Sequence, residues 1–253
     1  MSTTQKGTLF LVGVGPGDPE LVTVKALRIL AASPVWAAPL ARHSSRGEST
    51  ALAIAQAALP EARPEILHLE FAMKPVHLGR KTDPEQLAVW RAAADAVLAR
   101  LDAGRDVAFP TLGDVGLYST AFYLLTLIKD ERPEVTVRIV PGITAMSACS
   151  AGQMRPLALG DDIFAVVPAA FEDERLRDIL TRLDAVVLMK VHRRFDALLD
   201  LLEELGLVEQ SVLVECAGLP EERVYTDIRV ARGRKLHYFS TLLIRRKQTL
   251  VQQ

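Results

Sequence analysis

Three glycine-containing segments hold the residues of this chain whose types and spacing suit ligand binding. They are Gly15-Pro16-Gly17-Asp18, Thr111-Leu112-Gly113-Asp114 and Pro141-Gly142-Ile143-Thr144-Ala145. Each follows a short apolar run and precedes helical spacing, and ligands of open α/β sheets bind beyond the carboxyl ends of the strands. We therefore expect the three segments to meet at one cleft. Their backbone groups, two carboxylates and a hydroxyl suit a ligand with an amino-acid or nucleoside end better than a polyphosphate.

The first segment resembles a dinucleotide-binding loop but lacks its chemistry. Its third glycine comes one residue early for a G-x-G-x-x-G loop, and Pro16 removes a backbone N–H. Asp18 places negative charge where a phosphate would bind, and the ribose-binding acid expected about 20 residues on is missing. The alternative is a structural turn, in which Gly17 takes a positive φ and Asp18 caps a helix that begins at Pro19.

Composition sets limits on the class of protein. The 253 residues have a formal net charge of −1, so no global field attracts nucleic acid. No apolar run is long enough to span a membrane, and the N-terminus lacks the apolar core of a signal peptide. Cys149 and Cys216 are far apart, which favours neither a disulfide framework nor a zinc site. We expect a cytoplasmic protein with no bound metal and no membrane or nucleic-acid partner, and both thiols buried and unreactive.

Alternating strand and helix patterns predict an α/β fold with two unlike domains. In the first half the alternation is typical of a parallel sheet with helices on both faces, and one helix is expected to end at Gly104. In the second half the last strands follow one another with little helix, which indicates a mixed sheet with antiparallel members. We expect an N-terminal domain at residues 1–145 and a C-terminal domain at residues 146–253, with a ligand cleft between them.

The expected elements are bounded by the apolar patterns. The expected strands are Leu9–Val14, Val35–Ala38, Ile66–Leu69, Asp106–Pro110, Val135–Val140, Ile163–Val167, Ala185–Val191, Ser211–Glu215, Val224–Val230 and His237–Arg245. The clearest expected helices are Glu48–Ala58, Pro84–Ala103, Glu172–Arg182 and Phe195–Leu205.

The motifs GVGPGDPELVTVKA, LGDVGLYST and VPGITAMSA, in this order, resemble those of the tetrapyrrole methyltransferases, which use S-adenosylmethionine. The resemblance covers nearly the whole chain. Glu70–Met73, Leu87–Ala93, Val187–Val191 and Tyr238–Ser240 look most like the branch that methylates carbon 20 of precorrin-2 in cobalamin biosynthesis, either metal-free or loaded with cobalt. Alternatives are a sibling that acts on another ring carbon, or on a protein or RNA, and a SAM-binding module without catalysis. The near-neutral charge argues against RNA.

The resemblance implies a homodimer and a cofactor held in the cleft between the domains. Carried over position by position, it assigns cofactor contacts to Pro16, Leu112, Gly113, Asp114, Leu117, Tyr118, Thr144, Ala145, Met189 and Ala217. Two positions depart from the family pattern. Val115-Gly116 follow Asp114 where proline is usual, which is expected to make this loop more flexible. Pro39 stands near the position where uroporphyrinogen-methylating relatives carry an aspartate, so no base comes from there.

The substrate that the resemblance implies carries eight carboxylates, so cations are expected at its binding surface. Arg42, His43, Arg46, Lys74, Arg80 and Lys81 follow the second and third strands and are candidates for this role. For each residue alone a solvated loop charge is the better explanation, whereas the grouping favours carboxylate recognition. Methyl transfer from a sulfonium needs mainly alignment and exclusion of water. No catalytic residue is assigned, and His43, Glu70 and Glu215 are possible bases by location only.

Overall fold

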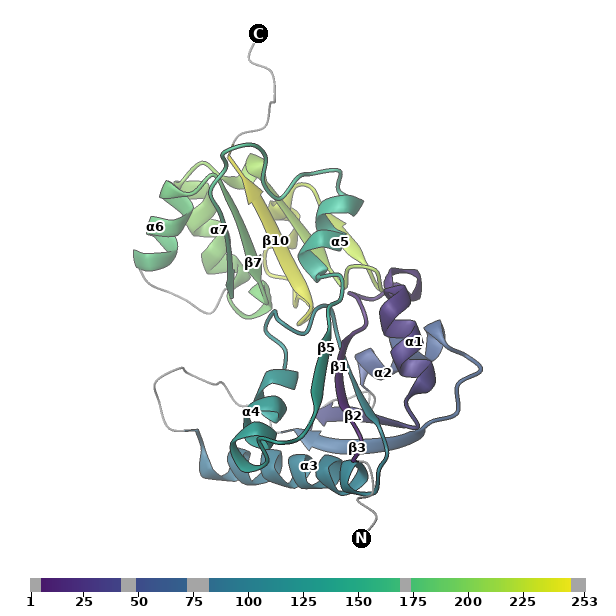
Figure 1. The fold of residues 1–253 in the computed structure, drawn as a ribbon. Coiled ribbons are helices and arrows are strands. Elements are labelled where there is room, and N and C mark those ends of the chain that lie inside the picture. Colours follow the sequence, from purple (N-terminus) through teal and green to yellow (C-terminus); the bar gives the residue numbers. More distant parts are fainter. Residues whose placement is uncertain (1–5, 42–48, 72–81, 169–173, 247–253) are drawn as a thin grey trace. The chain divides into compact units, whose positions relative to one another are not determined.

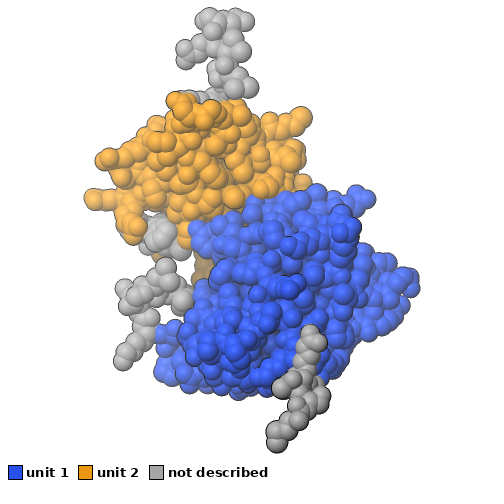
Figure 2. Space-filling view, in the orientation of Figure 1, with its two compact units in different colours: residues 1–144 blue, residues 145–253 orange. Residues whose placement is uncertain are grey.

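The computed structural model describes residues 6–41, 49–71, 82–168 and 174–246. The chain divides into two compact units, residues 1–144 (unit 1) and residues 145–253 (unit 2), which are drawn as a ribbon in Figure 1 and in two colours in Figure 2. Each unit is built on its own five-stranded sheet. Within the described ranges, no helix is long and apolar enough to cross a bilayer.

Unit 1 contains the parallel sheet that the alternation predicts. Its strands are β1 (Leu9–Gly13), β2 (Val35–Ala41), β3 (Glu65–Phe71), β4 (Val107–Thr111) and β5 (Val137–Val140), in the order β3-β2-β4-β1-β5. Every pair is parallel. In register, Gly13 lies beside Thr111 and Val12 beside Val140, so β1, β4 and β5 end at one edge of the sheet.

Helices cover both faces of this sheet, as predicted (Figure 1). They are α1 (Val24–Ala32), α2 (Thr50–Ala58), α3 (Pro84–Asp102) and α4 (Ala121–Glu131). Leu9 and Leu11 of β1 pack in one core with α3 and α4, whereas Phe10 and Val12 pack in the other with α1 and α2. Because β1 is buried on both sides, its sequence is a continuous apolar run.

The long helix α3 has the start and the stop that its sequence predicts. Asp83 caps it by accepting a hydrogen bond from Gln86 N (3.1 Å), and Pro84 is its first residue. At the other end Gly104 has a φ of 73°, and Arg105 N donates to Arg100 O (3.1 Å). Trp90 lies in the core, where its ring stacks on Tyr123 with centroids 4.7 Å apart.

Unit 2 contains the mixed sheet. Its strands are β6 (Phe164–Pro168), β7 (Ala185–Met189), β8 (Ser211–Glu215), β9 (Arg223–Tyr225) and β10 (Ser240–Arg245), in the order β6-β7-β10-β8-β9. The β6–β7 pair is parallel and the other pairs are antiparallel, as the run of late strands predicts. The helices are α5 (Ala145–Gly152), α6 (Glu174–Arg182) and α7 (Phe195–Glu204).

Three strands of unit 2 are shorter than the apolar pattern predicts. The strand expected at Ala185–Val191 ends at Met189, because the next residue, Lys190, has a φ of 62°. The strand expected at Val224–Val230 ends at Tyr225, because Asp227 accepts a hydrogen bond from Arg229 N (3.0 Å) and starts a 3-10 turn at Ile228–Ala231. The strand expected from His237 begins only at Ser240. There the amide of His237 donates to Glu215 Oε1, and the amide of Phe239 donates to His237 Nδ1 (3.1 Å), so neither joins the ladder.

Both cysteines are buried, as predicted, with exposures of 2% for Cys149 and 4% for Cys216. Burial raises the pKa of the Cys149 thiol from 9.0 to about 12, although a hydrogen bond with Thr241 opposes the shift. The unfolded chain therefore loses this proton near pH 9, whereas the folded chain keeps it. Since the folded state binds the extra proton, stability falls as pH rises above about 9.

This shift predicts a pH dependence that belongs to one residue. Between about pH 9 and about pH 10, the free energy of unfolding should fall by about 1 kcal/mol because the Cys149 thiol ionises in the unfolded chain only. Urea unfolding of the wild type and of Cys149→Ala at both pH values measures the difference. We expect the variant to lose less stability on this step than the wild type does. Equal losses in the two proteins would contradict the assignment.

Candidate functional site

The first two glycine segments of unit 1 are joined through their backbones where β1 and β4 end. Gly15 N donates to Gly113 O (3.2 Å), and Gly113 N donates to Gly15 O (2.7 Å). Val14 N also donates to Thr111 O (3.0 Å). Gly15 and Gly113 have φ values of 77° and 72°, which L side chains rarely adopt. Glycine at these two positions therefore permits the bridge.

The third segment packs against the other two with no room for a side chain. A Cβ on Gly142 would lie 2.2 Å from Gly113 O and 2.8 Å from Gly13 C. A Cβ on Gly13 would lie 2.6 Å from Gly142 N. The three backbones are thus in direct contact, which confirms the expectation that the segments meet at one edge of the sheet.

Asp114 fastens the second segment to the third. Its Oδ1 accepts a hydrogen bond from Gly116 N (2.7 Å), and its Oδ2 accepts one from Gly142 N (2.8 Å). The neighbouring Val115 is fully buried in the core of unit 1. The bond to the Gly116 amide restrains the loop at the residue where we expected added flexibility.

The first segment is a structural turn in its details. Asp18 accepts a hydrogen bond from Glu20 N (2.8 Å) and caps a short 3-10 turn, Pro19–Leu21, so the predicted cap is confirmed. The helix α1 begins later, at Val24, behind a second cap at Thr23. The prediction of a positive φ at Gly17 is wrong, because the chain reverses at Gly15, where it pairs with Gly113.

Backbone strain accompanies several of the residues implied as cofactor contacts. Four described residues other than glycine have a positive φ, and three of them are Tyr118 (52°), Lys190 (62°) and Cys216 (52°). Lys190 directly follows Met189 at the end of β7, and Cys216 directly precedes Ala217 after β8. Conformations of this kind cluster at ligand sites. The fourth, Met154, follows α5. No pattern in the sequence predicted this strain.

Seven of the ten expected cofactor contacts lie in unit 1 and three lie in unit 2. Pro16 lies in the first segment, Leu112, Gly113 and Asp114 lie in the second, and Leu117 and Tyr118 lie in the turn before α4. Thr144 directly precedes α5, which begins at Ala145. Ala145, Met189 and Ala217 belong to unit 2. The expected substrate contacts Arg42, His43, Arg46, Lys74, Arg80 and Lys81 lie outside the described residues.

Of the possible bases, Glu215 has a structural role. Its side chain is 3% exposed at the end of β8. Oε2 accepts a hydrogen bond from the Tyr225 hydroxyl (2.9 Å), and Oε1 accepts one from His237 N. Both oxygens therefore hold neighbouring segments of unit 2 in place. Glu70 lies near the end of β3 with its side chain exposed, and His43 lies outside the described residues.

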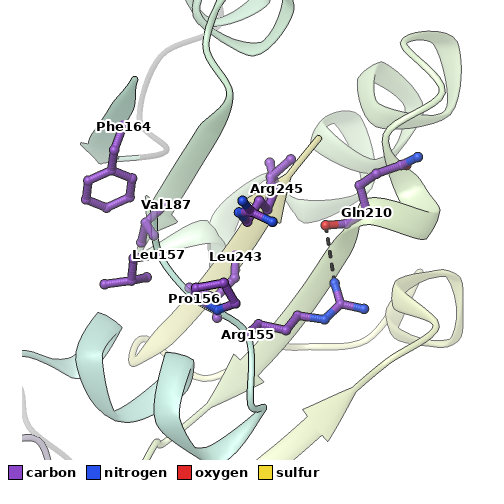
Figure 3. Close-up of a pocket in the computed structure, with 9 residues that line it drawn as sticks. Arg155, Pro156, Leu157, Phe164, Val187, Gln210, Leu243 and Arg245 are labelled. Carbon is purple, nitrogen blue, oxygen red and sulfur yellow. Dashed lines mark hydrogen bonds between the residues drawn. The ribbon is translucent and has the colours of Figure 1, made fainter. Parts of the chain in front are cut away.

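The pocket in Figure 3 is not a cofactor site. It lies in unit 2, where Arg155 donates to Gln210 O (3.3 Å) beside Leu157, Val187 and Leu243. Its cavity volume is about 10 Å³, which is space for roughly one water molecule. A wider depression lies in unit 1 beside Thr8 and Asp106, before β1 and β4 begin and so opposite the glycine segments.

The edge that carries the glycine segments has a donor and acceptor set that fits S-adenosylmethionine. Backbone groups of the three segments and the Thr144 hydroxyl can pair with an amino-acid end and with ribose hydroxyls. Each Asp114 oxygen accepts one hydrogen bond already and can accept another, so the carboxylate suits an ammonium group. The same charge disfavours a polyphosphate. Within the described ranges, no three metal-ligating side chains gather.

Comparisons with known proteins agree with this chemistry. Residues 8–230 match the model of a family described as Tetrapyrrole (Corrin/Porphyrin) Methylases. The chain is 36% identical over 242 residues to a cobalt-precorrin-2 C(20)-methyltransferase of Salmonella typhimurium, covering 95% of this chain and 97% of that protein. It is 32% identical to a precorrin-2 C(20)-methyltransferase of a Sinorhizobium species, covering 96% and 97%.

A solved structure shares the fold. The uroporphyrin-III C-methyltransferase of Thermus thermophilus, in complex with S-adenosyl homocysteine, superposes with a TM-score of 0.64. The superposition covers 94% of this chain and 97% of that protein, at 22% identity.

Proposed function

The chain belongs to the tetrapyrrole (corrin/porphyrin) methylases, and on this premise we propose that it transfers a methyl group from S-adenosylmethionine to carbon 20 of precorrin-2 or of cobalt-precorrin-2. The observation that carries the proposal is the similarity to two C(20)-methyltransferases over almost the full length of each chain. This similarity agrees with the expectation from the sequence motifs, which resemble the same branch of cobalamin biosynthesis.

We propose that the glycine-segment edge of unit 1 binds the cofactor. Pro16, Leu112, Gly113, Asp114, Leu117, Tyr118 and Thr144 are the contacts of unit 1. Support comes from the fixed backbone at this edge, where Gly142 and Asp114 lock the segments together. Ala145, Met189 and Ala217 of unit 2 are proposed on the resemblance alone. When bound, S-adenosylmethionine supplies an electrophilic methyl group on a sulfonium.

The protein contributes to the reaction mainly by positioning the two reactants. The reduced macrocycle supplies its own nucleophilic carbon, so the chain must hold two reactants in line and keep water away. Residues locked by backbone contacts do this without ordering new segments on binding. We assign no general base, and the cations that follow β2 and β3 in the sequence remain proposed contacts for the substrate carboxylates.

Assembly and location belong to the same proposal. We propose that the chain acts as a homodimer, which the family resemblance implies, and in the cytoplasm, which its composition indicates. Analytical ultracentrifugation of the purified protein tests the first point, with a single species of twice the chain mass expected. A monomer at micromolar concentration would contradict it.

One assay tests the activity directly. The enzyme is incubated under nitrogen with SAM carrying a carbon-13 methyl group and with enzymatically generated precorrin-2, either metal-free or loaded with cobalt. Mass spectrometry should detect one added methyl group, and carbon-13 NMR should place it at carbon 20. The metal state that reacts faster identifies the substrate.

The other outcomes of this assay are equally informative. A methyl group at another ring carbon would assign the chain to a sibling activity. No transfer, with SAM still bound in calorimetry, would show that the substrate is wrong. Absence of SAM binding would overturn the proposal.

A further inference from the structure

Five side chains gather at one end of the unit 2 sheet and have no role in the function described so far. Lys190 and His192 follow β7, whereas His237, Tyr238 and Phe239 precede β10. The antiparallel register pairs Thr241 with Met189 and Ser240 with Glu215, which brings the two groups to the ends of β7 and β8. We call these five residues the aromatic–histidine surface.

The rings of the aromatic–histidine surface contact one another in sequence. His192 packs edge-on to Tyr238 with centroids 5.2 Å apart, and Tyr238 lies 5.5 Å from Phe239. Phe239 in turn lies 5.1 Å from His237. Lys190 Nζ is 5.4 Å from the centroid of the Tyr238 ring, within the range of a cation–π contact.

Hydrogen bonds hold the segment that carries three of these rings. Glu215 accepts from the amide of His237, Cys216 N donates to Phe239 O (2.8 Å), and Lys190 N donates to Ser240 O (2.8 Å). Two of the holding residues, Lys190 and Cys216, have a positive φ. The surface is therefore fixed before any ligand binds.

Despite this support, the surface is not buried. Tyr238 is 42% exposed, and His237 is exposed beside it. Leaving a large ring in water while fixing its position stabilises the fold little, but it lowers the ordering cost of binding a flat partner. The arrangement is thus suited to recognition.

Of the five residues of this surface, Lys190 supplies a permanent positive charge and the two histidines supply ring nitrogens. Burial lowers the pKa of His192, a hydrogen bond with Lys190 O opposes this, and the charges of Arg193, His237 and Lys190 lower it further. Phe239 N donates to His237 Nδ1, which leaves Nε2 of that ring as the nitrogen that can donate to a ligand. Cations and N–H donors beside flat rings match a ligand that is both conjugated and anionic.

We propose that the aromatic–histidine surface binds the tetrapyrrole, with Tyr238 and Phe239 against the conjugated macrocycle and Lys190, His192 and His237 on its carboxylate side chains. This inference rests on the proposed function, because it takes a tetrapyrrole as the substrate. It adds a substrate surface in unit 2 that the cations after β2 and β3 do not include.

Binding measurements on four variants test the surface. The probe is uroporphyrin III, a stable tetrapyrrole with acetate and propionate side chains, and its fluorescence reports binding. Tyr238→Ala and His192→Gln should each raise the Kd for the probe by about tenfold, since one stacked ring or one charged hydrogen bond contributes about 1–3 kcal/mol. Tyr238→Phe keeps the ring and should stay within about twofold of the wild type.

Arg182→Gln is the charge control. Arg182 is an exposed cation at the end of α6, before β7 begins, and so at the other end of this strand from Lys190. Its Kd for the probe should match the wild type. Calorimetry with S-adenosyl homocysteine should give the same Kd for all variants, and circular dichroism identifies any variant that does not fold. NMR of the wild type adds a second measurement, in which the probe should raise the pKa of His192.

The outcomes separate this proposal from the function on which it rests. Wild-type protein that binds S-adenosyl homocysteine but not the probe would remove the tetrapyrrole substrate and the surface with it. Wild-type binding that Tyr238→Ala and His192→Gln leave unchanged would overturn the surface alone. Weaker binding of S-adenosyl homocysteine by folded Tyr238→Ala, with the probe unaffected, would also overturn it and reassign the surface to the cofactor.

Discussion

Gly142→Ala is expected to abolish methyl transfer and to lower the free energy of unfolding by about 2–4 kcal/mol. The added methyl group would lie 2.2 Å from Gly113 O and 2.8 Å from Gly13 C. Both neighbours are backbone atoms of the other two segments, so neither can rotate away as a side chain would. The three segments must separate, and the hydrogen bond between Gly142 N and Asp114 is strained at the same time.

Gly152→Ala is the matched control. Gly152 is the last residue of α5, and a Cβ built there meets nothing within 4 Å. This variant should keep full activity and raise the free energy of unfolding by less than about 1 kcal/mol, because alanine lowers the conformational entropy of the unfolded chain. Urea unfolding measures stability, and calorimetry with SAM measures the cofactor edge. If Gly142→Ala behaved like Gly152→Ala in both, the close contact of the three backbones would be wrong.

The sequence predicts the strands best where both faces of a strand are buried. The strands β1 and β4 of unit 1 are buried along their whole length, and both are apolar except for Thr111 at the end of β4. In unit 2, β8 has the bounds that its sequence predicts. Predicted strands are too long where a side chain accepts the hydrogen bond of a backbone amide that would otherwise pair with the neighbouring strand. The amide of His237 donates to Glu215, which lies 22 residues earlier in the chain. The apolar pattern around His237 cannot predict a bond to so distant a residue.

The candidate site is predictable in its location but not in its construction. The rule that ligands bind beyond the strand ends places the three glycine segments together, and the structure confirms their contact. The motifs did not indicate that Gly142 is needed for close approach rather than for a turn, or that Asp114 bonds an amide 28 residues away. Nor did they indicate that Tyr118 has a positive φ. These features depend on contacts between distant segments, which composition and periodicity do not encode.

Asp114→Ala is the second variant with a large expected effect. Alanine removes the acceptors of Gly116 N and Gly142 N. Water can replace the acceptor at the exposed Gly116 amide, whereas the partly buried Gly142 amide loses its partner at a cost of about 1 kcal/mol. The second and third segments then lose the side-chain bond between Asp114 and Gly142 N that joins them, and the Kd for SAM should rise at least about tenfold. Asp114→Asn keeps one oxygen acceptor but turns an NH2 group toward the other amide, so an intermediate loss is expected.

Asp83→Ala separates this effect from the loss of any capping carboxylate. Asp83 also lies in unit 1 and accepts a backbone hydrogen bond, from Gln86 N, but at the start of α3. Its replacement should cost about 1 kcal/mol and leave the Kd for SAM unchanged. If Asp114 fastens the segments, Asp114→Ala must lose both stability and affinity relative to this control. If Asp114→Ala lost affinity for SAM but kept the stability of the Asp83→Ala control, Asp114 would instead be a direct ligand contact. If Asp114→Ala lost neither stability nor affinity, both roles would be contradicted.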